Sequence, residues 1–108
     1  MNYKVKTIES FEKELKTLSK KYISLKTDFA NFLDFIEQNP LSGQPLGKNC
    51  YKIRFSIQSK GKGKSGGARI ITCVQVVHST VYLLSIYDKS EMENISDSVL
   101  KSKLKEIK

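Results

Sequence analysis

The hydrophobic pattern changes its period once along this chain, and this change limits the possible folds more than any other feature. From Glu9 to Gln38, apolar residues recur at spacings of three and four, which is typical of amphipathic helices. The pair Asn39-Pro40 then ends the helical pattern, because a residue before proline disfavours helical backbone. From Tyr51 onward, apolar residues alternate or form short β-branched runs, which is typical of strands. Helices followed by neighbouring strands predict an α+β fold.

The expected elements follow the order β-α-α-β-β-β-α within one domain spanning residues 1–108. We expect a strand at 2–7, helices at 9–20 and 24–38, strands at 51–58, 68–77 and 81–87, and a short terminal helix that starts at Ser96 or Asp97. The polar, turn-rich segment PLSGQPLGKN is expected to be a connection. Short turns between the last strands favour a mainly antiparallel sheet of about four strands, with the two long helices packed on one face.

Positive charge is concentrated in the middle of the chain. The protein carries 19 Lys and Arg against 11 Asp and Glu, a formal net charge of +8. No acidic residue lies between Glu37 and Asp88, and this interval holds seven of the basic residues. Such segregation is typical of a surface that binds a polyanion, either a nucleic acid or a membrane surface. The alternative is that the charge only keeps the protein soluble.

The composition argues against several classes of protein. No apolar stretch approaches the roughly 18 residues of a membrane span, and the N-terminal residues lack the apolar region of a secretory signal. Cys50 and Cys73 form no C-x-x-C pair, so we expect two ordinary thiols in a reducing cytoplasm. Since His78 is the single histidine, we expect no metal site, no cofactor and no Ser-His or Cys-His catalytic group.

The glycine-rich segment SKGKGKSGG does not match the motif of a nucleotide-binding P-loop. Its Gly63-Lys64-Ser65 matches the end of the motif G-x-x-x-x-G-K-[ST], but Gln58 stands where the first glycine is required. The segment also runs into a strand, so the helix N-terminus that would hold a phosphate is missing. What remains is a glycine-rich loop that can contact a phosphate chain through its lysines, Lys60, Lys62 and Lys64.

Four further cations form a candidate site. Lys52 and Arg54 are two residues apart on a strand, so they share one face while their apolar neighbours face the core. Arg69 opens the next strand and Lys89 follows the last one, so both can reach the same surface. Such a cluster can hold a phosphate and stabilise the charge that develops on it during transfer. The alternative is a solvated strand face, which is weakened because no nearby carboxylate can pair with the cluster. Tyr87 is a candidate either for stacking on a base or for the core.

Two segments of the chain resemble a known family. YKIRFSIQSKGKGKSGGARIIT and VYLLSIYDKSEMENIS are similar to the C-terminal half of RelE-superfamily toxins, and to the HigB-like branch in particular. The similarity rests on the strand K-I-R, the segment G-K-G-K-x-G-G-x-R-I-I and the closing L-L-x-I-Y-x-K-x-E-M. The N-terminal half of the chain agrees with the family in its layout of elements.

The resemblance implies the toxin of a type II toxin–antitoxin pair, with a microbial-RNase-like fold and metal-independent cleavage of mRNA in the ribosomal A site of a bacterial cytoplasm. In the family's reaction the 2′-OH beside the scissile bond attacks phosphorus and leaves a 2′,3′-cyclic phosphate and a 5′-OH. Lys52 matches the proposed general base, and Lys89 matches a basic residue near the leaving group. Arg54 and Arg69 match phosphate-binding and transition-state positions. The implied partners are mRNA, the ribosome with its rRNA, and a cognate antitoxin.

Two other functions stay open at this point. ParE, in the same superfamily, inhibits DNA gyrase without nuclease activity, although the K-x-R pair and the Gly-Lys loop suit RNA better than a protein target. The third possibility is a nucleic-acid-binding module that catalyses nothing. The family's substrate-stacking tyrosine corresponds here to a position near Ile95, which makes Tyr87 the candidate substitute.

Overall fold

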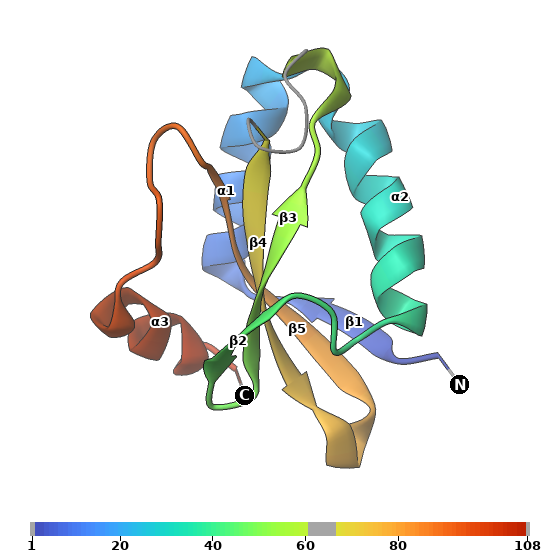
Figure 1. The fold of residues 1–108 in the computed structure, drawn as a ribbon, viewed down its shortest axis with the longest axis vertical. Coiled ribbons are helices and arrows are strands. Elements are labelled where there is room, and N and C mark those ends of the chain that lie inside the picture. Colours follow the sequence, from blue (N-terminus) through green and yellow to red (C-terminus); the bar gives the residue numbers. More distant parts are fainter. Residues whose placement is uncertain (1, 61–66, 108) are drawn as a thin grey trace.

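The computed structural model describes residues 2–60 and 67–107, and its elements follow the expected order with one addition (Figure 1). The helices are α1 (Glu9–Lys21), α2 (Leu25–Gln38) and α3 (Asp97–Leu104), with short 3-10 turns η1 (Gln58–Lys60) and η3 (Val76–His78). The strands are β1 (Lys4–Thr7), β2 (Gln44–Gly47), β3 (Cys50–Phe55), β4 (Ala68–Gln75) and β5 (Thr80–Asp88). None of these helices is long and apolar enough to cross a membrane.

A five-stranded sheet in the order β1-β5-β4-β3-β2 forms the centre of the molecule. β1 runs parallel to β5, and the other neighbouring strands are antiparallel. α1 and α2 pack on one face of the sheet (Figure 1). α3 contacts β5, and in this view it lies on the opposite side of the strands from α2. The predicted α+β class and the mainly antiparallel sheet are therefore confirmed.

The additional strand, β2, lies in the segment that was predicted to be a connection. It pairs with β3 across a turn at Lys48 and Asn49, whose φ angles are 55° and 62°. Two consecutive residues with positive φ are what a type I′ hairpin turn requires, and the twist of that turn matches the twist of paired strands. The prediction was wrong for residues 44–47 because β2 is stabilised by backbone pairing with β3, which its own sequence, Gln-Pro-Leu-Gly, does not reveal.

The alternating pattern of β3 separates the core from the cations. Ile53 and Phe55 are buried, whereas Arg54 between them is exposed. Phe55 receives the edge of Phe32 from α2, with the ring centroids 5.8 Å apart and the planes at 89°. Because successive side chains of a strand point to opposite faces, this packing directs Lys52 and Arg54 away from the helices.

Strand β5 is buried along its whole length, although β1 covers only part of its edge. β1 pairs with Thr80–Leu83, and beyond that point the Ile86 N–H donates to Glu14 of α1 at 3.1 Å. Lys103 of α3 donates to the same carboxylate at 2.9 Å. α3 itself is capped by Ser96, whose hydroxyl oxygen accepts from the Val99 N–H. Side chains from two helices thus shield an edge that would otherwise expose unpaired backbone groups.

Candidate nucleic-acid interface

Two arginines lie side by side on the sheet. Arg54 of β3 and Arg69 of β4 are direct partners in the strand register, so their side chains leave the same face, as predicted. No carboxylate of the described residues lies within ion-pair distance of either guanidinium. Like charges placed directly opposite each other in a sheet destabilise it. The pair therefore opposes folding on its own and becomes favourable when an anion lies between the guanidinium groups.

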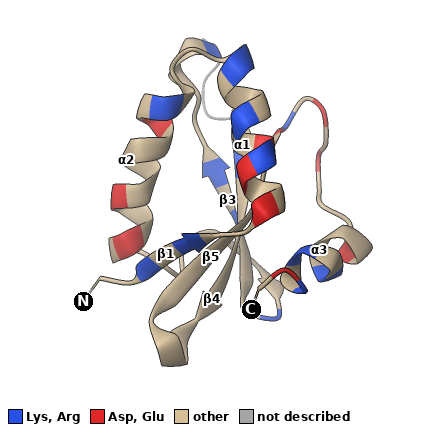
Figure 2. Ribbon diagram, turned by 180° about the vertical axis from the view of Figure 1, so that it is seen from behind, with Lys and Arg blue, Asp and Glu red and all other residues tan. Residues whose placement is uncertain are grey.

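The two arginines differ in their exposure to solvent. Arg54 is exposed, whereas Arg69 is 6% exposed and donates to the Ala68 carbonyl oxygen at 2.9 Å. Arg69 is thus held in place, because a buried guanidinium has fewer rotamers open to it, while Arg54 keeps the freedom to adjust. Figure 2 shows both signs of charge along α1 and α2, whereas β3 carries positive charge only.

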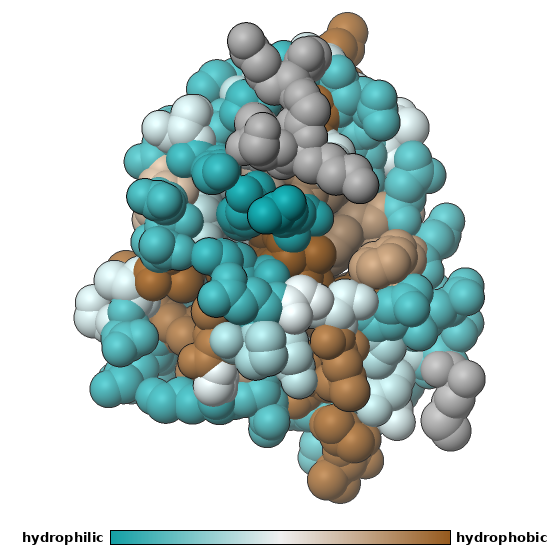
Figure 3. All heavy atoms as spheres, in the orientation of Figure 1, coloured by the Kyte–Doolittle hydropathy of each residue, from teal (hydrophilic) through white to brown (hydrophobic). Residues whose placement is uncertain are grey.

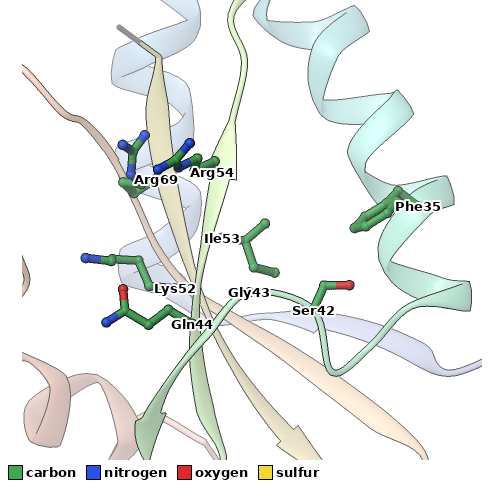
Figure 4. A pocket seen from close by; sticks show the side chains of 8 residues that line it. All are labelled: Phe35, Ser42, Gly43, Gln44, Lys52, Ile53, Arg54 and Arg69. Carbon is green, nitrogen blue, oxygen red and sulfur yellow. The ribbon is translucent and has the colours of Figure 1, made fainter. Parts of the chain in front are cut away.

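A hollow of about 510 Å³ lies where β2 begins, beside the part of β3 that β2 does not pair with (Figure 4). Lys52, Arg54 and Arg69 point to one side of β3, and Phe35 of α2 approaches from the other side. The face shown in Figure 3 is correspondingly hydrophilic near its middle, with a hydrophobic area directly beside it. The volume is within the range of small-molecule binding sites, and its lining combines cations with an aromatic ring.

The chain approaches the hollow closely at Gly43. Its φ is +100°, and a Cβ there would lie 2.5 Å from the backbone oxygen of Lys52. Only glycine fits both the backbone conformation and the approach to β3. Gly43 therefore lets the segment after α2 lie against the backbone of Lys52, with Ser42 and Gln44 at the rim of the hollow.

Lys52 contacts the segment between β5 and α3. Its ammonium donates to the Asn94 side-chain oxygen at 2.8 Å, and no ion pair involves it among the described residues. A neutral acceptor orients the amine without cancelling its charge. Asn94 thus places the amino group of Lys52 over the face that carries the arginines.

Lys60 lies in a different environment from the one expected. Its ammonium is 2.6 Å from the carboxylate of Asp88, and its side chain is 15% exposed while that of Asp88 is fully buried. Tyr22 donates to the same carboxylate at 2.5 Å. The candidate cluster was expected to lack a carboxylate partner, and among the described residues neither Arg54 nor Arg69 has one. Lys60, which was expected to contact a phosphate chain, pairs with Asp88 instead. The end of β5 brings Asp88 beside it, which the distance in sequence conceals.

The Asp88 carboxylate remains ionised in this setting. Burial would raise its pKa, but hydrogen bonds from Lys60, Tyr22 and Ser90 outweigh burial and hold the pKa well below its usual value. The Lys60 ammonium is therefore neutralised inside the protein, and its primary contact is structural.

No protein-family model matches this sequence, but solved structures do share its fold. A substituted variant of the E. coli toxin RelE in the free state is similar over 100% of both chains, with 21% identity and a TM-score of 0.66. The isolated E. coli RelE toxin covers 98% of this chain and 99% of its own length, with 19% identity and a TM-score of 0.61. The chain has the RelE fold. The toxin–antitoxin complex RelBE2 from Mycobacterium tuberculosis matches 82% of this chain and 92% of its own, with 20% identity and a TM-score of 0.60.

On this RelE fold the remaining predicted residues take different positions. Lys89 is half-buried directly after β5, and its N–H donates to the Gly67 carbonyl oxygen at 3.2 Å. Lys62 and Lys64 lie outside the described residues. Tyr87 is 8% exposed and pairs with Arg69 in the strand register, so its buried ring lies on the sheet face that carries the arginines. Burial raises the pKa of its hydroxyl, more than the charge of Arg69 lowers it.

Two contributors to the site were missed in the sequence. Phe35 is 47% exposed. The sequence could have indicated it, because Phe35 is an aromatic residue that lies off the apolar face formed by its neighbours in α2. Asn94 could not have been singled out from the sequence, because connecting segments commonly contain polar residues. The described residues contain no cluster of three or more possible metal ligands.

Proposed function

We propose that this protein is the toxin of a bacterial type II toxin–antitoxin system, of the HigB-like kind, and that it cleaves mRNA on the ribosome. The observation that carries the proposal is the paired Arg54 and Arg69 beside Lys52, for which the described residues supply no carboxylate partner. A scissile phosphate supplies the negative charge that this arrangement lacks. The RelE fold and the family-like motifs support the same conclusion.

The chemistry uses the RNA's own nucleophile. The 2′-OH attacks the adjacent phosphorus, and Lys52 is the proposed general base that accepts the proton of that hydroxyl. Charge that gathers on the phosphoryl oxygens is stabilised by Arg54 and Arg69, whose planar guanidinium groups match two oxygens at once. The bond to the 5′-oxygen breaks, Lys89 donates a proton to it, and the products are a 2′,3′-cyclic phosphate and a 5′-OH.

Substrate binding extends beyond the reacting phosphate. Lys62 and Lys64 add positive charge for the flanking phosphates, and this electrostatic term weakens with salt because binding releases counterions. mRNA in the ribosomal A site, with rRNA around it, is the proposed substrate, and the bacterial cytoplasm is therefore the proposed location. Neither a metal ion nor a cofactor is required.

A cognate antitoxin is part of the proposal. RelBE2, which has the same fold, is described as a toxin–antitoxin complex. An antitoxin of this chain would cover the cations of β3 and β4 with an acidic segment, because opposite charge blocks the phosphate site and speeds association.

The test maps new 5′-OH ends on a defined mRNA in a reconstituted translation system. We expect cuts within codons that require ribosomes, and their loss in the double variant Lys52→Ala/Arg69→Ala. The control is Lys20→Ala/Lys26→Ala, which removes the same charge from exposed positions on α1 and α2. Wild-type protein that is folded and yields no cuts would refute the nuclease proposal, and a gyrase supercoiling assay would then test the inhibitor alternative.

A further inference from the structure

We propose that Cys50 and Cys73 form an oxidation site, at which a hydroperoxide converts the two thiols into a disulfide between β3 and β4. The two cysteines are direct partners in the register of these strands. Both are free and buried, with 1% and 7% of their surfaces exposed. The proposal stands apart from the nuclease function because it depends on strand pairing and thiol chemistry alone.

The backbone hydrogen bonds show which kind of pair this is. The Val74 N–H donates to the Asn49 carbonyl oxygen at 2.9 Å, one position beyond the cysteines. In an antiparallel ladder this makes Cys50 and Cys73 a non-hydrogen-bonded pair, in which the Cα atoms are about 4.5 Å apart and the side chains are closest. Disulfides span Cα separations of roughly 4.4–6.8 Å, so the strands need little movement to accept the bond.

One of the two thiols can be reached from solvent. Cys73 lines a surface hollow of about 420 Å³ together with Asn49, Val76 and His78 at the β4–β5 turn. Val76 is 58% exposed, so the hollow is open at the protein surface. A molecule as small as hydrogen peroxide can enter it, whereas Cys50 does not line the hollow and is 1% exposed.

The contact between the thiols favours the reactive form of Cys73. A hydrogen bond from Cys50 lowers the pKa of Cys73 to about 7, although burial acts in the opposite direction. Cys50 has one proton to donate, and the Lys48 carbonyl oxygen at 3.6 Å competes for it. Because Cys73 lines the open hollow and Cys50 is 1% exposed, Cys73 is the thiolate that attacks and Cys50 is the thiol that resolves the product.

The reaction balances with one peroxide for each disulfide. The Cys73 thiolate attacks one oxygen of hydrogen peroxide, the O–O bond breaks, and sulfenic acid and hydroxide form. The Cys50 sulfur then attacks the sulfenic sulfur, forms the S–S bond and releases the oxygen as water. Two thiols lose two electrons and two protons, and the peroxide is reduced to two water molecules.

The bond would constrain the segment that carries the cations. It closes a loop over residues 51–72, which contains Lys52, Arg54 and Arg69. Cross-linking removes conformational freedom from the unfolded chain, and a loop of this length raises the unfolding midpoint by roughly 15 °C.

The experiment uses the full chain, reduced and freed of reductant, and exposes it to graded hydrogen peroxide while circular dichroism shows that it stays folded. Remaining thiols are alkylated in denaturant, and intact mass and peptide mapping follow. We expect the mass to fall by two hydrogen atoms, a peptide linking Cys50 to Cys73, and a rise in unfolding midpoint that a reductant reverses.

The variant Cys50→Ser separates the two steps. Its oxidation should stop at a sulfenic acid on Cys73, which dimedone traps. The variant Cys73→Ser should gain no oxygen and form no disulfide. The wild-type measurement decides the matter even if one of these variants fails to fold. Three outcomes would each overturn the proposal. The first is oxygen uptake without a disulfide, and the second is a disulfide only between two chains. The third is folded protein that stays unchanged at peroxide levels that oxidise the urea-unfolded chain.

Discussion

Replacing Asp88 by asparagine should strongly destabilise this protein. The side chain keeps its shape, but the Lys60 ammonium, 15% exposed, loses the negative charge 2.6 Å away. Removing one partner of a buried ion pair leaves an uncompensated charge and costs about 3–5 kcal/mol. The flexible stem of lysine lets the ammonium move towards water, so we expect the lower end, about 3 kcal/mol. For a domain of this size the unfolding midpoint should fall by roughly 10–20 °C.

The assay is urea denaturation of purified wild-type and variant protein, with the midpoint shift converted through a common slope. The control is Glu9→Gln, because its ion pair with Lys13 spans 3.3 Å between side chains that are 77% and 80% exposed. That variant should change stability by at most about 0.5 kcal/mol.

A second variant isolates the charge from the packing. Adding Lys60→Met to Asp88→Asn removes the unpaired ammonium, so the double variant should recover part of the lost stability. The reasoning is refuted if Asp88→Asn costs less than about 1 kcal/mol, or if Lys60→Met brings no recovery in its background.

Three further predictions concern pH, backbone and the proposed general base. The folded-state pKa of Asp88 lies below its unfolded value of about 3.9. Its contribution to the free energy of unfolding is therefore complete above that pH and is lost as the pH falls towards the folded pKa. Stability, followed by circular dichroism, should accordingly fall less steeply with acid in Asp88→Asn than in wild type. Gly43→Ala places a Cβ 2.5 Å from the Lys52 backbone oxygen at a φ of +100°, and it should cost about 1–3 kcal/mol by urea denaturation and also slow mRNA cleavage. Asn94→Ala removes the acceptor 2.8 Å from the Lys52 ammonium at an exposed position, so it should leave stability within about 0.5 kcal/mol and lower the cleavage rate, whereas an unchanged rate would contradict the orienting role.

Much of the architecture could be predicted because it depends on local pattern. The first helix was expected at 9–20 and occupies Glu9–Lys21, since its apolar spacing and charged first and last turns are carried by neighbouring residues. The face of β3 was also predictable, because alternation in one strand decides which side chains can enter a core. That Arg69 can reach the same surface was also expected, but its direct pairing with Arg54 depends on the register of β3 and β4.

Other features depend on segments that meet only after folding. β2 exists because a type I′ turn at Lys48 and Asn49 returns the chain along β3, and its own residues carry no strand pattern. Lys60 meets Asp88 across 28 positions of sequence. The register of β3 against β4 places Cys50 opposite Cys73, and no local pattern in either strand reveals it.

The sequence by itself determined the fold class, the segregation of positive charge and the strand face on which the cations lie, because each follows from the period and composition of short segments. The tertiary structure decided which charges are free, which are neutralised and which thiols are paired. These depend on strand register and on contacts between distant residues, and a one-residue change of register would reassign every cross-strand partner.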